Sequence, residues 1–103
     1  MKYLFIDDIR EPEHFIGIEI YVARSYNEAI NMLKNVKFDA ISFDHDLGED
    51  KTGYDIAKYI IENHIKFKQG FKIHSANPVG KFNIEQLLTH YGYNKINNKL
   101  FDF

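Results

Sequence analysis

The chain has 103 residues, of which 45% are hydrophobic and 16% aromatic, so it can bury the core of one domain and is too short for two. The formal net charge of −2 gives no global attraction to nucleic acid or to a membrane, and we find no DNA-binding signature. The lack of cysteine excludes disulfides and thiol nucleophiles, and no apolar run approaches the roughly 20 residues of a membrane helix. We therefore expect a single soluble, cytoplasmic domain over 1–103.

Strand and helix patterns alternate along the chain. Short apolar runs, which are typical of buried parallel strands, predict strands over 3–6, 18–23, 40–43 and 71–75. The polar segment 7–15 is too short for a long helix, so we expect the first connection to be abbreviated.

Capping signals and apolar stripes predict the helices. Residues 25–28 form a capping box in front of the first helix, and the second helix follows the loop 47–53. The last helix is predicted to begin with Asn83 as its N-cap and to end at Gly92. The tail, 94–103, is expected to pack on the body of the domain or to form a short fifth strand at the edge.

The polarity of the strands predicts their order. The first and third strands are apolar throughout, whereas the second contains Glu19 and the fourth contains Lys72. Charged residues favour the edges of a sheet, and right-handed crossovers then give the order 2-1-3-4. In this order, the residues that follow the first, third and fourth strands share one rim, where open α/β sheets bind ligands.

Two acidic clusters end strands of this sheet. Asp7 and Asp8 follow the first strand, and Asp44, His45 and Asp46 follow the third. Converging carboxylates repel one another, and Mg²⁺, which prefers oxygen ligands, relieves that repulsion. We predict a site for Mg²⁺ or another divalent cation; the alternative is that aspartate simply forms turns at strand ends.

The segment 74–80 adds groups that suit a phosphate. It offers an imidazole, a hydroxyl, a carboxamide and a flexible backbone, from His74, Ser75, Asn77 and Gly80. Arg10, just after the acidic pair, is placed to clamp a phosphate. The alternatives are an ordinary turn at the Asn-Pro pair and a surface ion pair of Arg10 with Glu11 or Glu13.

His45 lies between two aspartates. An imidazole in this setting can act as a general acid or base near neutral pH. Alternate residues of an extended segment face opposite ways, so His45 can equally point to the other face and pack there.

An acidic pair after the first strand and an aspartate after the third resemble the receiver domain of response regulators. The resemblance implies that Asp7 and Asp8 bind Mg²⁺, that Asp44 is the phosphoryl-acceptor position and that Ser75 contacts the phosphoryl group. The chain departs from receivers in lacking a fifth strand that ends in a phosphate-contacting lysine, for which only Lys95 or Lys99 is available. It also carries an extra acid, Asp46.

The chain more closely resembles the cyclic-phosphate-processing receiver family. The resemblance is carried, in chain order, by 4–10, 44–48, 52–53 and 74–80. This family consists of small stand-alone receiver-like domains, common in phages and bacteria, and is proposed to act on cyclic phosphate ends such as those of RNA. The fold expected is a three-layer α/β fold with a reduced receiver- or flavodoxin-like parallel sheet.

We interpret the chain as a metal-dependent hydrolase that processes a phosphate ester. By resemblance, its partner is a cyclic phosphate at an RNA end, in a nucleotide or in another phosphorylated small molecule. The expected catalytic residues are Asp44, Asp46, His45 and His74, the phosphate-binding residues Ser75, Asn77, Arg10 and Gly80, and the metal ligands Asp7, Asp8 and Asp44.

Two other functions stay open. In a signalling module, Asp44 would accept a phosphoryl group. In a non-catalytic nucleotide-binding protein, Tyr54 or Phe82 would stack on the base. A Toprim-like nuclease fits less well, because that class places glutamate after its first strand.

Overall fold

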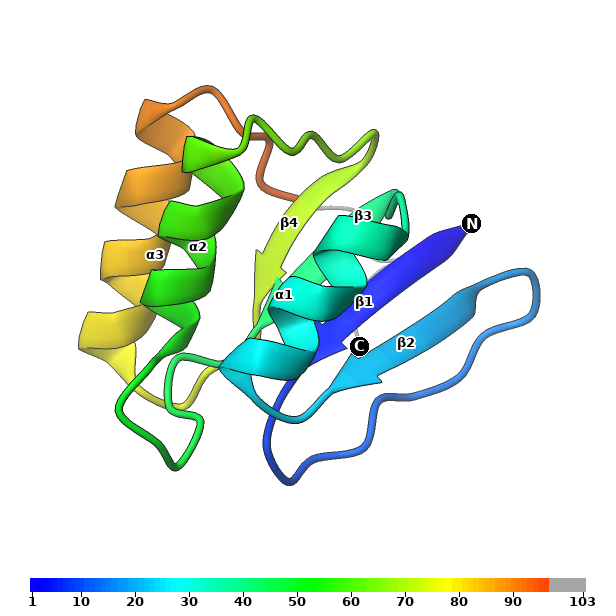
Figure 1. The fold of residues 1–103 in the computed structure, drawn as a ribbon, viewed down its shortest axis with the longest axis horizontal. Helices are drawn as coiled ribbons and strands as arrows, with labels where there is room; N and C mark the ends of the chain where they lie inside the picture. The colour runs from blue at the N-terminus through cyan, green and yellow to red at the C-terminus, as the bar shows by residue number, and fades with distance from the viewer. Residues whose placement is uncertain (97–103) are drawn as a thin grey trace.

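The structure is a computed structural model in which residues 1–96 are described, and a sheet of parallel strands forms its centre (Figure 1). Within that range the strands are β1 (Lys2–Ile6), β2 (Glu19–Ala23), β3 (Ala40–Phe43) and β4 (Gly70–Ile73). They pair in the order β2-β1-β3-β4, which confirms the order predicted from the charged residues. The predicted bounds of β3 agree with the structure, and those of the other three strands differ by one or two residues at an end.

The register of the sheet brings together the residues that follow each strand. Ile6 of β1 pairs with Phe43 of β3, and Phe43 pairs with Ile73 of β4. The ladder continues one step further, because the N–H of Asp44 donates to the carbonyl of Ile6 and the N–H of His74 to that of Phe43. The side chains after β1, β3 and β4 therefore emerge next to one another at the carboxyl edge of the sheet.

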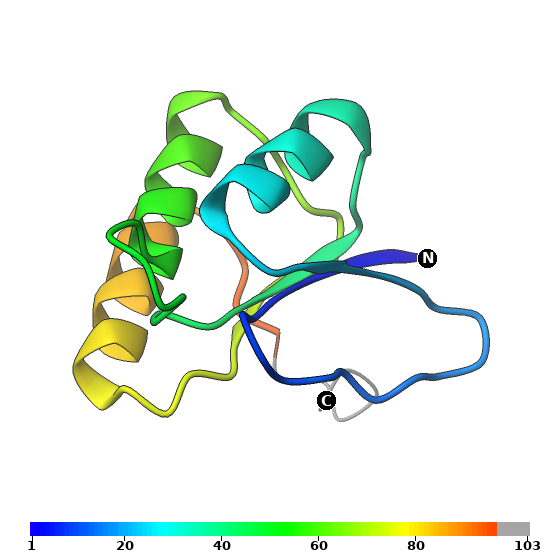
Figure 2. The same cartoon turned by 60° about the horizontal axis from the view of Figure 1, so that its bottom comes forward.

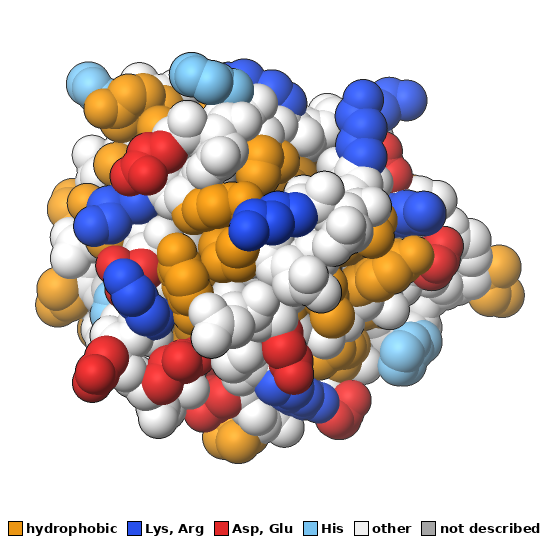
Figure 3. Space-filling model, viewed as in Figure 1, with side chains coloured by type: hydrophobic (Ala, Val, Ile, Leu, Met, Phe, Trp, Pro, Cys, Tyr) orange, Lys and Arg blue, Asp and Glu red, His pale blue; other side chains and the backbone are white. Residues whose placement is uncertain are grey.

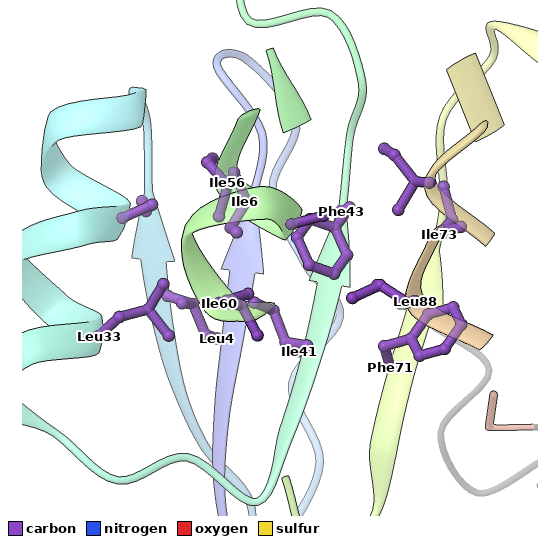
Figure 4. Packing of buried hydrophobic residues seen from close by; sticks show 14 of the residues in the cluster. Leu4, Ile6, Leu33, Ile41, Phe43, Ile56, Ile60, Phe71, Ile73 and Leu88 are labelled. Atoms are coloured by element: carbon purple, nitrogen blue, oxygen red, sulfur yellow. The ribbon is translucent and has the colours of Figure 1, made fainter. Parts of the chain in front are cut away.

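The described helices lie on one side of the sheet (Figures 1 and 2). They are α1 (Tyr26–Asn35), α2 (Gly53–Glu62) and α3 (Pro78–His90), and each packs on the next. Strand side chains that alternate toward this face, such as Leu4 and Ile41, join buried residues of the helices in the main core (Figure 4). No helix in this part of the chain is long and apolar enough to cross a membrane.

The opposite face of the sheet is covered by irregular chain (Figure 2). Residues 7–18 connect β1 to β2 without a helix, as the short polar segment predicts. A smaller apolar cluster on this side contains Tyr3, Phe5, Ala40 and Ile96. The third layer of the expected fold is therefore, within residues 1–96, an extended segment, because the connection is too short to form and return from a packed helix.

Arg24, at the end of β2, fastens this extended segment to the sheet. Its guanidinium donates to the backbone carbonyls of Asp7 and Arg10, and it forms an ion pair with Glu11. The ion pair that the sequence offered as an alternative for Arg10 is thus made by Arg24 instead. The side chain of Arg10 lies at the rim of the sheet.

The first two helices begin at capped termini. The hydroxyl of Ser25 accepts from the N–H of Glu28, as predicted, but the carboxylate of Glu28 reaches the N–H of Arg24 and not that of Ser25. Helix α2 begins with a complete capping box between Thr52 and Asp55, which the sequence analysis did not identify.

The last helix begins six residues earlier than the sequence analysis predicted. Its N-cap is Asn77 and not Asn83, and the Asn77 side chain accepts from the N–H of Gly80 at 3.0 Å. Pro78 follows at the first helical position, where a missing N–H costs nothing. The helix ends at His90, and Gly92 takes the left-handed conformation just beyond it.

The beginning of the tail lies beside β4. The N–H of Phe71 donates to the carbonyl of Asn94, and the N–H of Ile96 donates to the carbonyl of Phe71. A single parallel bridge, between Phe71 and Lys95, stands where a short fifth strand was expected. The rest of the tail, 97–103, falls outside the described residues.

At Gly53, the first turn of α2 lies in close contact with the backbone that follows β3. A Cβ at this position would lie 2.2 Å from the backbone oxygen of Asp44. Alanine gains roughly 1 kcal/mol over glycine in an open helix. We nevertheless expect Gly53→Ala to lower the free energy of unfolding in urea, because the clash is with backbone. Lys58→Ala, an exposed change in the same helix, is the control and should change stability little; a Gly53→Ala protein as stable as the parent would contradict this packing.

Candidate functional site: an acidic cluster at the carboxyl edge of the sheet

Carboxylates from β1 and β3 meet at the carboxyl edge of the sheet. Asp7, Asp8 and Asp44 each offer one oxygen, and these atoms all lie within 4.8 Å of one another. Asp7 and Asp44 are buried, and Asp8 is partly exposed. A Cβ at Gly48 would approach the Asp8 carboxylate to 3.1 Å, so the loop after β3 passes directly beside the cluster. Hard oxygen ligands at this spacing fit a divalent cation such as Mg²⁺.

Asp7 is the most strongly held member of the cluster. One of its oxygens accepts from the backbone N–H groups of Ile9 and Arg10, at 2.9 and 2.8 Å. The other oxygen lies 3.0 Å from Nε2 of His74. Burial alone would raise the pKa of Asp7, but these hydrogen bonds together lower it below its ordinary value. Asp7 is therefore a fixed negative charge inside the rim.

In Asp44, the effects that raise the pKa outweigh those that lower it. Its burial, and next the negative charge of Asp7, raise the pKa of Asp44 above its ordinary value. Hydrogen bonding from Ser75 and the positive charge of Arg10 counteract only part of this rise. The ionised cluster is thus under electrostatic strain, and a cation between these carboxylates would relieve it.

A buried hydrogen-bonded chain runs from β3 through His74 to Asp7. The hydroxyl of Ser42 lies 2.6 Å from Nδ1 of His74, and the His74 ring is stacked on Phe5 with centroids 4.4 Å apart. Burial lowers the pKa of His74, so the ring is neutral near pH 7. The Asp7 carboxylate can only accept, so Nε2 carries the proton and Nδ1 accepts from Ser42.

Ser42 was missed in the sequence analysis. It is 1% exposed and has no access to a ligand. The signal for it was present, because it is the polar residue in an otherwise apolar strand and lies two positions before Asp44, on the same face. The sequence placed His74 at the open rim as a catalytic group, whereas its ring turns back to Asp7.

Arg10 and Ser75 complete the rim around the cluster. Nη1 of Arg10 donates to the carbonyl of His74 at 2.9 Å, and its Nε lies 3.9 Å from the Asp7 carboxylate. The Arg10 side chain thus crosses from the loop after β1 to the end of β4. Ser75 bonds to the side chain of Asp44 and also accepts from the N–H of Asn77. Both residues therefore border the acidic cluster.

His45 points away from the cluster, toward α3. Its Nδ1 lies 3.0 Å from a carboxylate oxygen of Asp46, and Asn77 donates to the other oxygen at 3.3 Å. These hydrogen bonds lower the pKa of Asp46, so this exposed carboxylate stays ionised. A Cβ at Gly80 would lie 2.3 Å from the His45 ring. Gly80 therefore makes room for His45, and its N–H is already bound to Asn77.

The parallel sheet and its acidic rim define a receiver-like α/β domain. Comparison with protein families finds a match over residues 2–90 to the family described as the cyclic-phosphate processing receiver domain. The match spans most of the chain, so the chain belongs to this family, as the sequence resemblance predicted. No match is found among curated proteins or among solved structures.

The raised pKa of Asp44 makes a prediction about stability without metal. The folded state binds the proton of Asp44 more tightly than the unfolded state does. Ionisation of Asp44 therefore lowers the free energy of unfolding as the pH rises above the ordinary pKa of 3.8, and this loss is absent at lower pH. In EDTA at pH 7 we expect Asp44→Asn to melt at a higher temperature than the parent, with the difference shrinking toward pH 4. A change of 1 kcal/mol moves the melting temperature of a domain of this size by roughly 4–8 °C.

The exposed Asp50 supplies the matched control for this measurement. Asp50→Asn makes the same chemical change in the loop after β3, outside the cluster. It should leave the melting temperature near that of the parent. An Asp44→Asn protein that melts at or below the parent temperature at pH 7 would show that the cluster is not under repulsive strain.

Proposed function

We propose that the protein hydrolyses a cyclic phosphate ester with the help of a divalent cation. The observation that carries the proposal is the convergence of Asp7, Asp8 and Asp44 within 4.8 Å, beside the hydroxyl of Ser75 and the guanidinium of Arg10. A cation site with an anion site at its border suits a phosphate. The description of the family, cyclic-phosphate processing, supports this substrate class.

The chemistry of the donor set fits Mg²⁺ or a similar hard cation. Asp8 and Asp44 have carboxylate oxygens available at the rim, while Asp7 is already engaged by three N–H donors. We assign Asp8, Asp44 and Asp7 as the ligands of the cation. The carboxylates of Asp8 and Asp44 have oxygens available for it, whereas the carboxylate of Asp7 is held in position by its hydrogen bonds. A bound cation would neutralise the charge that develops on the phosphate oxygens during reaction.

The rim residues divide the remaining work. Arg10, Ser75 and Asn77 would bind and orient the phosphate oxygens. Water attacks phosphorus, one P–O ester bond of the ring breaks, and the product is a phosphomonoester with a free hydroxyl. The base takes one proton from the water, and the leaving oxygen takes up one proton.

Asp46 and His45 are the candidates for moving these protons. The carboxylate of Asp46 is ionised and can accept a proton, and its hydrogen bond to His45 offers a route for passing that proton on. His74 has a different task in this proposal. It holds Asp7 in place through Nε2, with Nδ1 bonded to Ser42, and does not touch the phosphate.

The phospho-accepting signalling function is less well supported. Asp44 occupies the acceptor position of receivers, but the ammonium group of Lys95, one of the lysines considered for the missing contact, pairs with Glu85 of α3 at 2.5 Å. Lys99 lies outside the described residues.

Acidic and basic side chains are interspersed over the face shown in Figure 3, so this face has no continuous basic surface for a long nucleic acid. The proposed function does not require such a surface.

Cation binding can be measured without a substrate. A ligand that binds only the folded state at 100 times its dissociation constant stabilises the protein by about 2.7 kcal/mol. We expect Mg²⁺ to raise the melting temperature of the parent and of Asp50→Asn, but not of Asp8→Asn. Equal rises in all three proteins would place the bound ion away from the cluster, and no rise in any of them would remove the metal-dependent mechanism.

Turnover is tested with 2′,3′-cyclic nucleotides and Mg²⁺, with the phosphomonoester product followed by chromatography. We expect Asp46→Asn to lower kcat by about 10²–10⁴-fold, the usual contribution of a general base. Asp50→Asn should retain the parent rate. Intact cyclic substrates after long incubation with the parent protein would refute hydrolysis, and an acid-labile phosphoryl adduct that is lost in Asp44→Asn would favour the signalling function instead.

A further inference from the structure

An open groove of about 770 Å³ lies between α2 and α3, outside the acidic cluster. Both helices run side by side, with their first turns at the carboxyl edge of the sheet (Figure 1). The groove is lined by His45, Thr52, Tyr54, Asn83, Gln86, Leu87 and His90. Its volume falls within the range of roughly 300–1,000 Å³ that is typical of small-molecule sites, and far exceeds what a phosphate group needs.

The lining of the groove is polar but carries no carboxylate, ammonium or guanidinium group. Asn83 and Gln86 present carboxamides, each of which can donate and accept hydrogen bonds. Leu87 and the partly buried ring of Tyr54 add apolar surface. The ammonium of Lys58 lies 5.8 Å from the centre of the Tyr54 ring and helps to hold it in place. Such a surface fits a flat, uncharged ring with polar edges and not a second phosphate.

The groove and the acidic cluster border the same segment of chain. His45 lines the groove and directly follows Asp44 in the sequence, so their Cα atoms are about 3.8 Å apart. The N–H of Gly53, in the first turn of α2, donates to the carbonyl of His45 at 2.8 Å. A ligand that lies over this segment would have the carboxylates on one side and the groove on the other.

The length of the groove limits the size of that ligand. Asn83 and His90 are seven residues apart on α3, which corresponds to a rise of about 10 Å. This length accommodates one base with its ribose. Of the two aromatic residues considered for base stacking, Tyr54 lies in the lining.

We propose that the groove binds the nucleobase of a nucleoside phosphate whose phosphate lies at the acidic cluster. The inference rests on the proposed function for the position of the phosphate, but the groove makes its own contacts with the base. Among the partners that the family resemblance implies, it selects those that carry a base, namely a nucleoside cyclic phosphate, either free or at the 3′ end of an RNA. The carboxamides of Asn83 and Gln86 read the edge of the base.

Nucleosides without any phosphate test the groove independently of catalysis. The parent protein is titrated, without metal, with adenosine, guanosine, cytidine and uridine, and the NMR signals of the side-chain amides and imidazoles are followed. We expect at least one nucleoside to shift the signals of Asn83, Gln86 and His90 together. If none of the four nucleosides shifts them, the groove is not a base site, whatever the outcome of the turnover assay.

A second measurement compares a nucleoside 2′,3′-cyclic phosphate with a base-free ribose 2,3-cyclic phosphate. In the parent we expect the nucleoside compound to bind at least tenfold more tightly, and this ratio to fall about tenfold in Asn83→Ala/Gln86→Ala. Thr89→Ala, an exposed neutral change on the same helix, should keep the parent ratio. A parent that binds or hydrolyses both compounds equally would overturn the inference and leave the proposed function intact.

The same measurement separates the two sources of the base. A trinucleotide that ends in the same cyclic phosphate is added as a third ligand. Affinity equal to that of the mononucleotide indicates a free nucleotide as the substrate, and tighter binding indicates an RNA end. In both cases the loss in Asn83→Ala/Gln86→Ala should be the same, because the terminal base occupies the groove; a trinucleotide unaffected by the double substitution would contradict the inference for RNA.

Discussion

The buried negative charge of Asp7 is the feature on which the rest of the site depends. It is placed at the end of a central strand, where water cannot stabilise it, and three N–H groups do so instead. One of these groups is Nε2–H of His74, whose other ring nitrogen is bonded to Ser42. Burial and this negative charge together raise the pKa of Asp44, and the cation proposed for the rim would relieve the repulsion.

Side chains along β3 and the two residues after it point alternately to the two faces of the sheet, and these faces differ in chemistry. Ser42 and Asp44 face the side of the sheet without helices, with its buried polar chain. His45 faces the other way, toward Gly80 of α3 and the groove. A single residue step therefore turns the chain from the acidic cluster to a neutral, carboxamide-lined surface, and both parts of a nucleotide could be bound at one loop.

The sheet order and the acidic cluster could be predicted from sequence, because both follow from local rules. Charged residues mark edge strands, which gives the strand order. Because neighbouring parallel strands end at the same edge of the sheet, Asp7, Asp8 and Asp44 are expected to lie close together. The direction of side chains was harder to predict. That His74 turns inward depends on Ser42, which is distant in the sequence. The start of α3 has a local signal in Asn77 and Pro78, but the same pair also fits a turn, and the sequence analysis predicted Asn83 as the N-cap instead. The groove depends on how two helices pack, which no local pattern encodes.

The extended segment 7–18 has two tasks at once. It covers the sheet face that has no helix, and it carries Asp8 and Arg10 of the candidate site, with Arg24 as its main fastening. Detachment of this segment would uncover the apolar cluster around Phe5 and, in the same event, separate the carboxylates of the candidate site. A cation bound at the rim would therefore also hold this segment on the sheet, and its binding would slow amide hydrogen exchange in β1 and β2.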